Sequence, residues 1–363
     1  MEQGSTQKQT TRQGILGERR KPALFVTGAG GEVGHGLIST LSRQGVTDIV
    51  ATDLRELDKD LRSQCAESYL ADVCDREALD RILSMYQVKE VFHLAAVLST
   101  RAEFAPEVAH QVNVNGTLNI LQIAAEQGRM YGEPVKVIFP SSIATYGFAS
   151  LSEKSDAGAV SEYRHARPKT IYGCNKLYCE HLGRYYAHSY RQLASDSTQG
   201  SDGNRGVVDF RSIRYPGLIS AETVPTGGTS DFVPEMLHAA ARGEPYVCFV
   251  REDTRIPFMT MPEAIEATLQ LSQSPRNELS QIVYNIASFN PSAGEVAELV
   301  REYFPGTVIS FEPDDRRQAI VDSWPEAVDC SSASEDWGFA PTWTLEGAFD
   351  EYIVPSIKQQ YAD

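Results

Sequence analysis

Short apolar segments alternate with amphipathic segments through the first 215 residues of the chain. The apolar runs have the length of buried strands, and the segments between them repeat their apolar residues at helical spacing, as Val33, Leu37 and Leu41 do. Strands are predicted at 23–28, 47–53, 68–72, 91–96, 135–140 and 207–214, and helices at 33–44, 75–86, 107–127 and 172–190. Strands and helices in this order predict an α/β fold with a Rossmann-like, doubly wound parallel sheet.

The alternation weakens after residue 217. Helices are predicted at 231–242, 262–270 and 292–303, and one more strand at 282–287. We expect a Rossmann domain over 23–220 and a smaller C-terminal lobe over 221–363, some of whose segments can return to the sheet. The polar segment 1–22 predicts a disordered tail, with a mitochondrial presequence as the alternative because it is basic. The Gly/Ser-rich segment 193–205 predicts an exposed loop insertion.

Charge and cysteine content narrow the partners and the compartment. The net charge of −16 repels phosphate backbones and anionic lipids, which argues against nucleic acid and membrane partners. The six cysteines form no CxxC pair and the histidines no HExxH motif, so we predict no bound metal. The same cysteine pattern favours a reduced, cytoplasmic protein, or a mitochondrial matrix protein if 1–22 is a presequence. No apolar run reaches the roughly 18 residues of a membrane span.

Glycines cluster after the first predicted strand, in FVTGAGGEVGHGLI at 25–38. Gly28, Gly31 and Gly34 predict a turn in which a pyrophosphate approaches the backbone at a helix N-terminus. Asp53 ends the next strand, where its carboxylate can accept ribose hydroxyls and repel a 2′-phosphate. This favours NAD over NADP, although Arg55 tempers the preference. A structural turn with a solvated aspartate is the alternative.

Other residues are predicted to line the dinucleotide. Asp72 and Val73 follow the third strand and can flank the adenine, or they simply cap a loop. The small residues of His93-Leu94-Ala95-Ala96 would let the dinucleotide cross the sheet. The remaining predicted cofactor contacts are Glu32, Val33, Leu54, Tyr215 and Pro216, together with Tyr172 and Lys176.

The segment PKTIYGCNK places Tyr172 and Lys176 on one face of a helix. A free tyrosine has a pKa near ~10, and a neighbouring ammonium can lower it by ~1–3 units. Tyr172 could then accept a hydroxyl proton while hydride leaves for a nicotinamide, and Lys176 could also hold the nicotinamide ribose. The intervening Cys174 and Asn175 are expected to point away from this face.

A predicted strand ends at Pro140 in FPSSIATYG, which exposes two hydroxyls that can bind the reacting oxygen. The glycine loop, HLAA, PSSIATYG, YGCNK and RYPG together resemble the extended short-chain dehydrogenase/reductase superfamily over residues 23–220. This resemblance implies that Ser142, Tyr172 and Lys176 are the catalytic serine, base and lysine.

A narrower resemblance covers residues 211–339. RSIRYPGLIS, GGTSDF, DTRIPFMTMPEAIEATLQL and RRQAIVDSWPEAVD, followed by DWGF, are similar to the L-threonine 3-dehydrogenases of that superfamily. The similarity implies NAD-dependent oxidation of the C3 hydroxyl of L-threonine to 2-amino-3-oxobutanoate, with the C-terminal lobe binding substrate. It also implies a homodimer formed through the helices at 107–127 and 172–190.

The same resemblance implies a substrate pocket. Its predicted members are Ser99, Ser141, Ser142, Tyr172, Thr229 and Trp324. Trp324 fits the role of a core aromatic nearly as well as that of a pocket wall.

Three other functions are alternatives. A nucleotide-sugar 4-epimerase would use the same three catalytic residues with NAD recycled internally, and would need cations such as Arg251, Arg255 and Arg316 for a sugar diphosphate. A sugar-nucleotide dehydratase typically carries an Asp-Glu pair where this chain has Thr145-Tyr146. A protein that only senses NAD would have no need of Tyr172 with Lys176.

Overall fold

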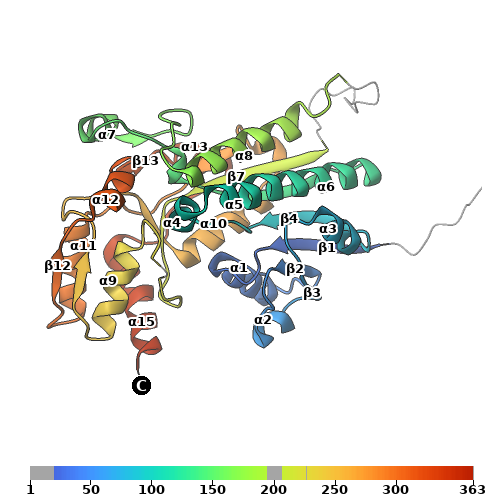
Figure 1. Ribbon diagram of the computed structural model, residues 1–363. Helices are drawn as coiled ribbons and strands as arrows, with labels where there is room; N and C mark the ends of the chain where they lie inside the picture. The colour runs from blue at the N-terminus through green and yellow to red at the C-terminus, as the bar shows by residue number, and fades with distance from the viewer. Residues whose placement is uncertain (1–19, 194–206, 226, 363) are drawn as a thin grey trace, which may run out of the picture.

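A computed structural model describes residues 20–193, 207–225 and 227–362 of the chain (Figure 1). The predicted N-terminal tail, apart from its last three residues, and the predicted insertion at 193–205, apart from Leu193, lie outside the described residues. Among the described residues, no helix combines the length and apolarity that a membrane crossing needs.

A seven-stranded parallel sheet lies at the centre of the molecule, in the order β11-β7-β5-β4-β1-β2-β3. Its strands are β1 (Lys21–Thr27), β2 (Ile49–Asp53), β3 (Glu67–Leu70), β4 (Tyr86–His93), β5 (Val135–Ser142), β7 (Val208–Tyr215) and β11 (Val283–Asn285). The strand order reverses between β1 and β4, and parallel sheets bind ligands at the carboxyl ends of the strands at such a point. The predicted Rossmann-like α/β fold is therefore confirmed.

Helices cover both faces of the sheet, each over its own apolar cluster (Figure 1). One face carries α1 (Glu32–Arg43), α2 (Lys59–Ser63) and α10 (Met261–Gln273). The other carries α3 (Arg76–Leu83), α6 (Gly116–Tyr131) and α8 (Ile171–His188). The short helices α4 (Ser99–Phe104) and α5 (Pro106–His110) follow β4 and pack on α8, and α7 (Leu151–Ala157) follows β5.

Three predicted elements differ clearly from the structure. The helix expected over 75–86 ends at Leu83, and the strand expected over 91–96 is β4, which begins at Tyr86. Polar residues in the first half of β4 interrupt its apolar run, although Tyr86 and Val88 are buried, so a pattern based on apolar runs does not find where the strand begins. The single helix expected over 107–127 is divided into α5, a π-helical turn at Gln111–Asn115, and α6.

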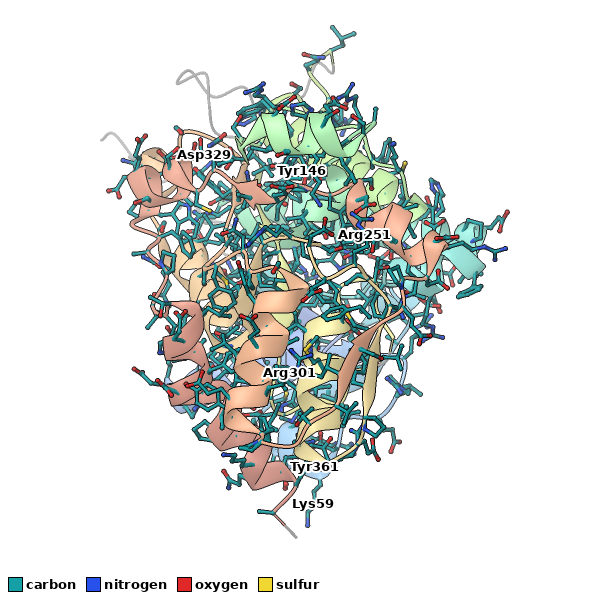
Figure 2. The ribbon with its side chains drawn as sticks, turned by 90° about the vertical axis from the view of Figure 1, so that its left-hand side faces the viewer. Lys59, Tyr146, Arg251, Arg301, Asp329 and Tyr361 are labelled. Atoms are coloured by element: carbon teal, nitrogen blue, oxygen red, sulfur yellow. The ribbon has the colours of Figure 1, made fainter. Side chains whose placement is uncertain are left out.

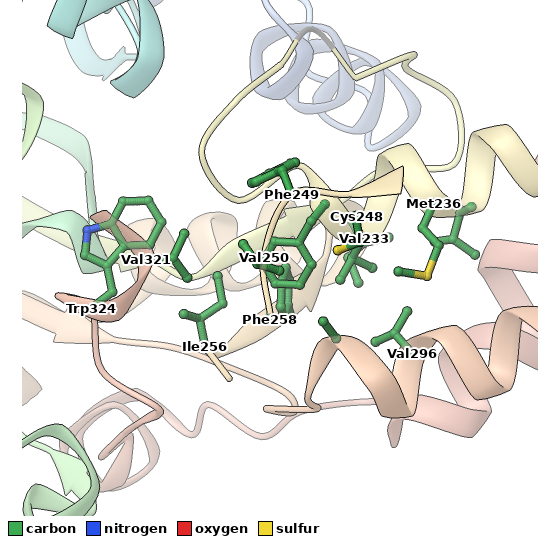
Figure 3. Packing of buried hydrophobic residues seen from close by; sticks show 14 of the residues in the cluster. Val233, Met236, Cys248, Phe249, Val250, Ile256, Phe258, Val296, Val321 and Trp324 are labelled. Carbon is green, nitrogen blue, oxygen red and sulfur yellow. The ribbon is translucent and has the colours of Figure 1, made fainter. Parts of the chain in front are cut away.

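Part of the second half of the chain returns to the main sheet. Strand β11 pairs with β7, and α10 packs on α1 and on the sheet. The rest forms a lobe around a large apolar core that includes Phe232 and Phe258 (Figure 3). The lobe and its junction contain three two-stranded pairs, β8 (Gly217–Ile219) with β10 (Phe258–Thr260), β9 (Tyr246–Cys248) with β12 (Ile309–Phe311), and β6 (Ala159–Val160) with β13 (Ala327–Val328). Its helices are α9 (Phe232–Ala241), α11 (Ala293–Tyr303), α12 (Asp315–Asp322), α14 (Leu345–Ala348) and α15 (Val354–Gln360). Helix α13 (Ser331–Trp337) packs instead on β11 of the main sheet.

A buried arginine joins β7 to the C-terminal end of α10. The Arg211 guanidinium donates to the backbone oxygens of Leu271, Ser272 and Ser274 at 2.6, 3.0 and 2.7 Å. The Asp209 carboxylate accepts its other two donors at 3.1 and 2.7 Å. A cation here satisfies carbonyls that the end of a helix leaves free and complements the helix dipole. Arg211, the first arginine of the RSIRYPG segment, therefore has a structural role.

Candidate active site

The glycine loop lies between β1 and α1, and two of its glycines have no room for a side chain. Gly28 has φ +68°, and a Cβ atom there would lie 2.6 Å from the backbone nitrogen of Ala95. A Cβ atom on Gly34 would lie 2.6 Å from the carbonyl oxygens of Gly28 and Ala29. Gly31 is the exposed N-cap residue of α1, and it offers no side chain to cap the first N–H groups of the helix. The loop therefore forms a tight backbone cradle that leaves a helix N-terminus available to an anionic ligand.

Asp53 lies against this cradle from the end of β2. Its Oδ2 accepts a hydrogen bond from the backbone N–H of Gly30 at 3.0 Å, and its Oδ1 accepts the N–H of Arg55 at 3.1 Å. Leu54 beside it is mostly exposed, as is Glu32 at the start of α1. The fold thus brings together the carboxylate and the glycines that the sequence separates.

Asp72 and Val73 both have structural partners. The Asp72 carboxylate accepts the N–H of Cys74 at 2.8 Å. The Val73 side chain is buried against Gly116 of α6, and its carbonyl accepts a hydrogen bond from Asn119 at 2.9 Å. The loop-capping interpretation accounts for both side chains, and their contact with an adenine stays a prediction.

A directed chain of hydrogen bonds lies below the residues that follow β4. The Thr117 hydroxyl donates to the carbonyl of Asn113 at 2.6 Å, so it accepts from Nε2 of His93 at 3.0 Å. Nδ1 of His93 then accepts from the Thr27 hydroxyl at 2.8 Å, and Thr27 Oγ1 accepts the N–H of Ala95 at 3.3 Å. Burial, with a smaller effect from the charge of Lys176, lowers the pKa of His93 to about 3, so the ring stays neutral. The chain holds the half-buried Leu94, Ala95 and Ala96 beside the glycine loop.

The three predicted catalytic residues lie where β5 ends and α8 begins. Helix α8 begins with two caps, because the Thr170 hydroxyl accepts the N–H of Gly173 at 3.1 Å and the Glu103 carboxylate accepts that of Ile171 at 2.8 Å. Its first turns pack on the 3₁₀ turn that follows Ser142. Oγ of Ser142 accepts the N–H of Ala144 at 3.1 Å, which leaves its own proton available for donation.

Lys176 is held beside the Tyr172 ring. Its Nζ donates to the carbonyl of Pro140 at 2.6 Å and lies 5.6 Å from the ring centroid of Tyr172. Both side chains are buried. Burial lowers the pKa of Lys176 to about 8, although Cys179 and Glu180 raise it. Burial also raises the pKa of Tyr172, so the expected lowering of this pKa by Lys176 is wrong for the protein alone. The cost of removing a phenolate from water is larger here than the effect of an ammonium near the ring.

Three hydroxyl groups meet between the C-terminal lobe and α4. Oγ1 of Thr229 lies 3.3 Å from Oγ of Ser99 and 3.3 Å from Oγ1 of Thr100. The predicted pair Ser99 and Thr229 is therefore brought together from positions 130 residues apart. Thr100 was missed, since a threonine in a short polar segment carries no signal of its own.

Trp324 and Ser141 are both buried. Trp324 belongs to the same apolar cluster as Tyr172, and Figure 3 shows its indole beside Val321. The Ser141 hydroxyl donates to Glu180 at 2.5 Å, so its side chain is engaged with the interior instead of with the other pocket residues.

The remaining predicted residues lie near the end of β7, at the start of α1 and within YGCNK. The Tyr215 hydroxyl is hydrogen-bonded to Thr268 of α10, so any cofactor contact at Tyr215 would come from its backbone. Pro216 is buried and Val33 is half-buried. Between Tyr172 and Lys176, Cys174 is exposed and Asn175 is buried.

A cavity of about 710 Å³ lies elsewhere, beside the beginning of β7 and the end of α8. Its lining includes Arg184, His188 and Asp209, and none of the predicted site residues. Within the described ranges, no group of three His, Cys, Asp or Glu side chains is arranged to hold a metal ion.

The model of the NAD dependent epimerase/dehydratase family matches residues 24–287, so the chain belongs to this family. The chain is also similar to individual proteins along most of its length. The chain is 31% identical over 329 residues to the mitochondrial L-threonine 3-dehydrogenase of Bos taurus, covering 90% of this chain and 81% of that one. An uncharacterized epimerase/dehydratase of Staphylococcus haemolyticus is 30% identical over 339 residues, which are 93% of this chain and 98% of that one. The crystal structure of L-threonine dehydrogenase from Clostridium difficile superposes with a TM-score of 0.82 at 30% identity, covering 95% and 100% of the two chains.

Proposed function

We propose that the protein oxidises the C3 hydroxyl of L-threonine to 2-amino-3-oxobutanoate with NAD as the oxidant. The proposal rests on two groups of residues, each of which the fold assembles from separate parts of the chain. The buried Tyr172 and Lys176 lie at the sheet end that also carries the glycine loop, and Ser99 meets Thr229 from the C-terminal lobe. Relatives named as L-threonine dehydrogenases support the choice of substrate.

The residues present fit a dinucleotide. Gly28 and Gly34 form a cradle that a Cβ atom would fill, α1 presents its N-terminus, and Asp53 offers a carboxylate beside the loop. When bound, NAD would supply the hydride acceptor and a positive charge. The negative Asp53 favours NAD over NADP, because it would repel a 2′-phosphate.

In the proposed mechanism, the Ser142 hydroxyl donates a hydrogen bond to the C3 oxygen of the substrate and orients it. Tyr172 accepts the proton of that hydroxyl as the hydride leaves C3. Burial alone holds the Tyr172 proton in place, so the base requires nearby positive charge, which Lys176 provides in part. The hydroxyls of Ser99, Thr100 and Thr229 can bind the polar end of an amino acid.

Absorbance at the NADH band tests this function directly. L-Threonine with NAD is expected to produce NADH, and allo-threonine, serine and 3-hydroxybutyrate define which groups of the substrate are recognised. No NADH with any of them, together with turnover of a UDP-sugar, would favour an epimerase.

The structure gives an argument against a sugar-diphosphate site, because Arg251 is paired with Asp322 and Arg255 with Glu295. Both arginines therefore form ion pairs within the protein in place of contacts with a diphosphate.

Replacing Asp53 by serine is expected to weaken NAD binding by about 10-fold or more, since a charged hydrogen bond to ribose is lost. Binding of NADP should improve at the same time, because the repulsion of its 2′-phosphate disappears. Isothermal titration with both dinucleotides measures the change in preference. Asp60→Asn, an exposed charge removal on α2, is the matched control. An unchanged preference in Asp53→Ser would reject the assigned role.

We also propose that the protein is a cytoplasmic homodimer. Three apolar side chains are exposed on neighbouring helices, Phe104 of α4 by 86%, Val108 of α5 by 56% and Tyr178 of α8 by 55%. A second copy would cover these side chains. Light scattering is expected to give twice the mass of one chain, and Phe104→Asp should give the monomer. A monomeric wild-type protein would contradict the proposal.

A further inference from the structure

A buried ion pair follows the catalytic residues along α8. Tyr172, Lys176 and Glu180 are spaced four residues apart, so they share one face of the helix. Glu180 meets Arg214 of β7, whose Nε donates to Oε1 at 2.9 Å and whose terminal nitrogen donates to Oε2 at 2.6 Å. The side chains of Glu180 and Arg214 are only 4% and 3% exposed. This is a bidentate pair removed from solvent.

The other hydrogen-bonding groups of Glu180 and Arg214 also have partners. The Ser141 hydroxyl donates to Glu180, and the Arg214 guanidinium donates to the carbonyl of Glu162 at 2.8 Å. The same guanidinium lies 4.8 Å from the ring centroid of Tyr146. The Tyr146 hydroxyl donates to Asn285 at 2.7 Å, and Asn285 also contacts the backbone of Asp329, which lies near Tyr146 in the upper part of Figure 2. A buried pair adds little net stability over apolar residues of the same size, so stability alone does not explain it.

The pair connects three elements of the site. Glu180 belongs to the helix that carries Tyr172 and Lys176. Ser141 directly precedes Ser142 at the end of β5, and Arg214 directly precedes Tyr215 at the end of β7. One carboxylate therefore fixes the ends of two strands against the catalytic helix.

We propose that Glu180 and Arg214 are positioning residues, which hold α8 against β5 and β7 and keep Lys176 protonated beside Tyr172. The inference rests on the proposed function, in which Tyr172 and Lys176 act on the substrate. It goes beyond that function by assigning a role to two residues that do not touch the reacting atoms.

Glu180 is the carboxylate that favours the charged form of Lys176. On α8 Lys176 is faced by Tyr172, which burial keeps protonated, and by Cys179 and Glu180. From β4 it is faced by His93, which is neutral, and β5 contributes the carbonyl of Pro140 and the ring of Phe139. Arg214 on β7 is paired with the same carboxylate. Cys179 also favours the charged form of Lys176, and burial raises the pKa of its own thiol to about 11.

The test compares Glu180→Gln with the double variant Glu180→Gln/Arg214→Met, which leaves no unpaired buried charge. The titration of Lys176 is followed by the ¹³Cε resonance of labelled lysine, assigned by its loss in Lys176→Met. Glu180→Gln is expected to lower the pKa of Lys176 by about one unit, since a buried unit charge nearby has an effect of that size. The double variant removes the Arg214 cation together with the carboxylate, so it should lower this pKa by a smaller amount. The alkaline limb of the kcat–pH profile should move to lower pH in each variant by as much as this pKa falls, because Lys176 must stay charged. Glu298→Gln, the same charge removal on an exposed face of α11, should leave both readouts unchanged.

The outcomes separate the two roles. An unchanged Lys176 titration in both folded variants would overturn the proposal, even with a lower kcat at every pH. Failure of the double variant to fold would also overturn it, since the pair would then be needed for the fold itself. Absence of threonine oxidation by the wild-type enzyme would reject the proposed function, and the resonance titration would still decide the charge effect of Glu180.

Discussion

Replacing Tyr172 by phenylalanine is expected to lower kcat for threonine oxidation by about 10³-fold, within the range for loss of a general base. The ring and its packing would remain, since the side chain is buried in an apolar cluster and only its hydroxyl is removed. The dissociation constant for NADH should stay within about twofold, because the proposed cofactor contacts at the glycine loop do not involve this hydroxyl. Steady-state kinetics and a fluorescence titration with NADH measure the two quantities.

Tyr163→Phe provides the control for this variant, because it removes the same hydroxyl from an exposed tyrosine. It should keep wild-type kinetics. Retention by Tyr172→Phe of more than a tenth of the wild-type kcat would show that another group accepts the proton.

The second large effect is expected from Gly28→Ala. Its added Cβ atom would meet the nitrogen and Cα of Ala95 at 2.6 and 2.7 Å, at a φ of +68° that disfavours any side chain. The loop can relieve the contact only by moving away from the residues after β4, which opens the cradle. We expect the affinity for NADH to fall by about 10-fold or more, as expected when backbone donors to a phosphate are displaced.

Gly45→Ala separates this steric effect from backbone strain. Gly45 has φ +84°, and a Cβ atom there would meet nothing within 4 Å. The variant should lose about 1 kcal/mol of folding free energy and keep its affinity for NADH. Equal losses of affinity in the two variants would mean that strain, and not contact with Ala95, determines the effect of Gly28→Ala.

Features that depend on near neighbours in the chain were predicted well. The glycine turn, the strand before it and the four-residue spacing of Tyr172 and Lys176 are local patterns, and helix geometry alone places the last two on one face. The limits of β4 were predicted poorly, because Gln87, Lys89 and Glu90 interrupt the apolar run in the first half of this central strand.

The sequence by itself determined the α/β class, the glycine loop, the acidic residue after β2 and the tyrosine–lysine pair, because each is encoded in periodicity or in a short motif. Tertiary structure alone decided that Thr100 joins Ser99 and Thr229, that Ser141 turns to Glu180, and that Glu180 meets Arg214. It also decided the sign of the Tyr172 pKa shift, since burial raises this pKa where spacing suggested that it falls. The physical reason is the same in each case. Contacts between distant segments and the exclusion of water depend on how the elements pack, and local sequence patterns do not specify that packing.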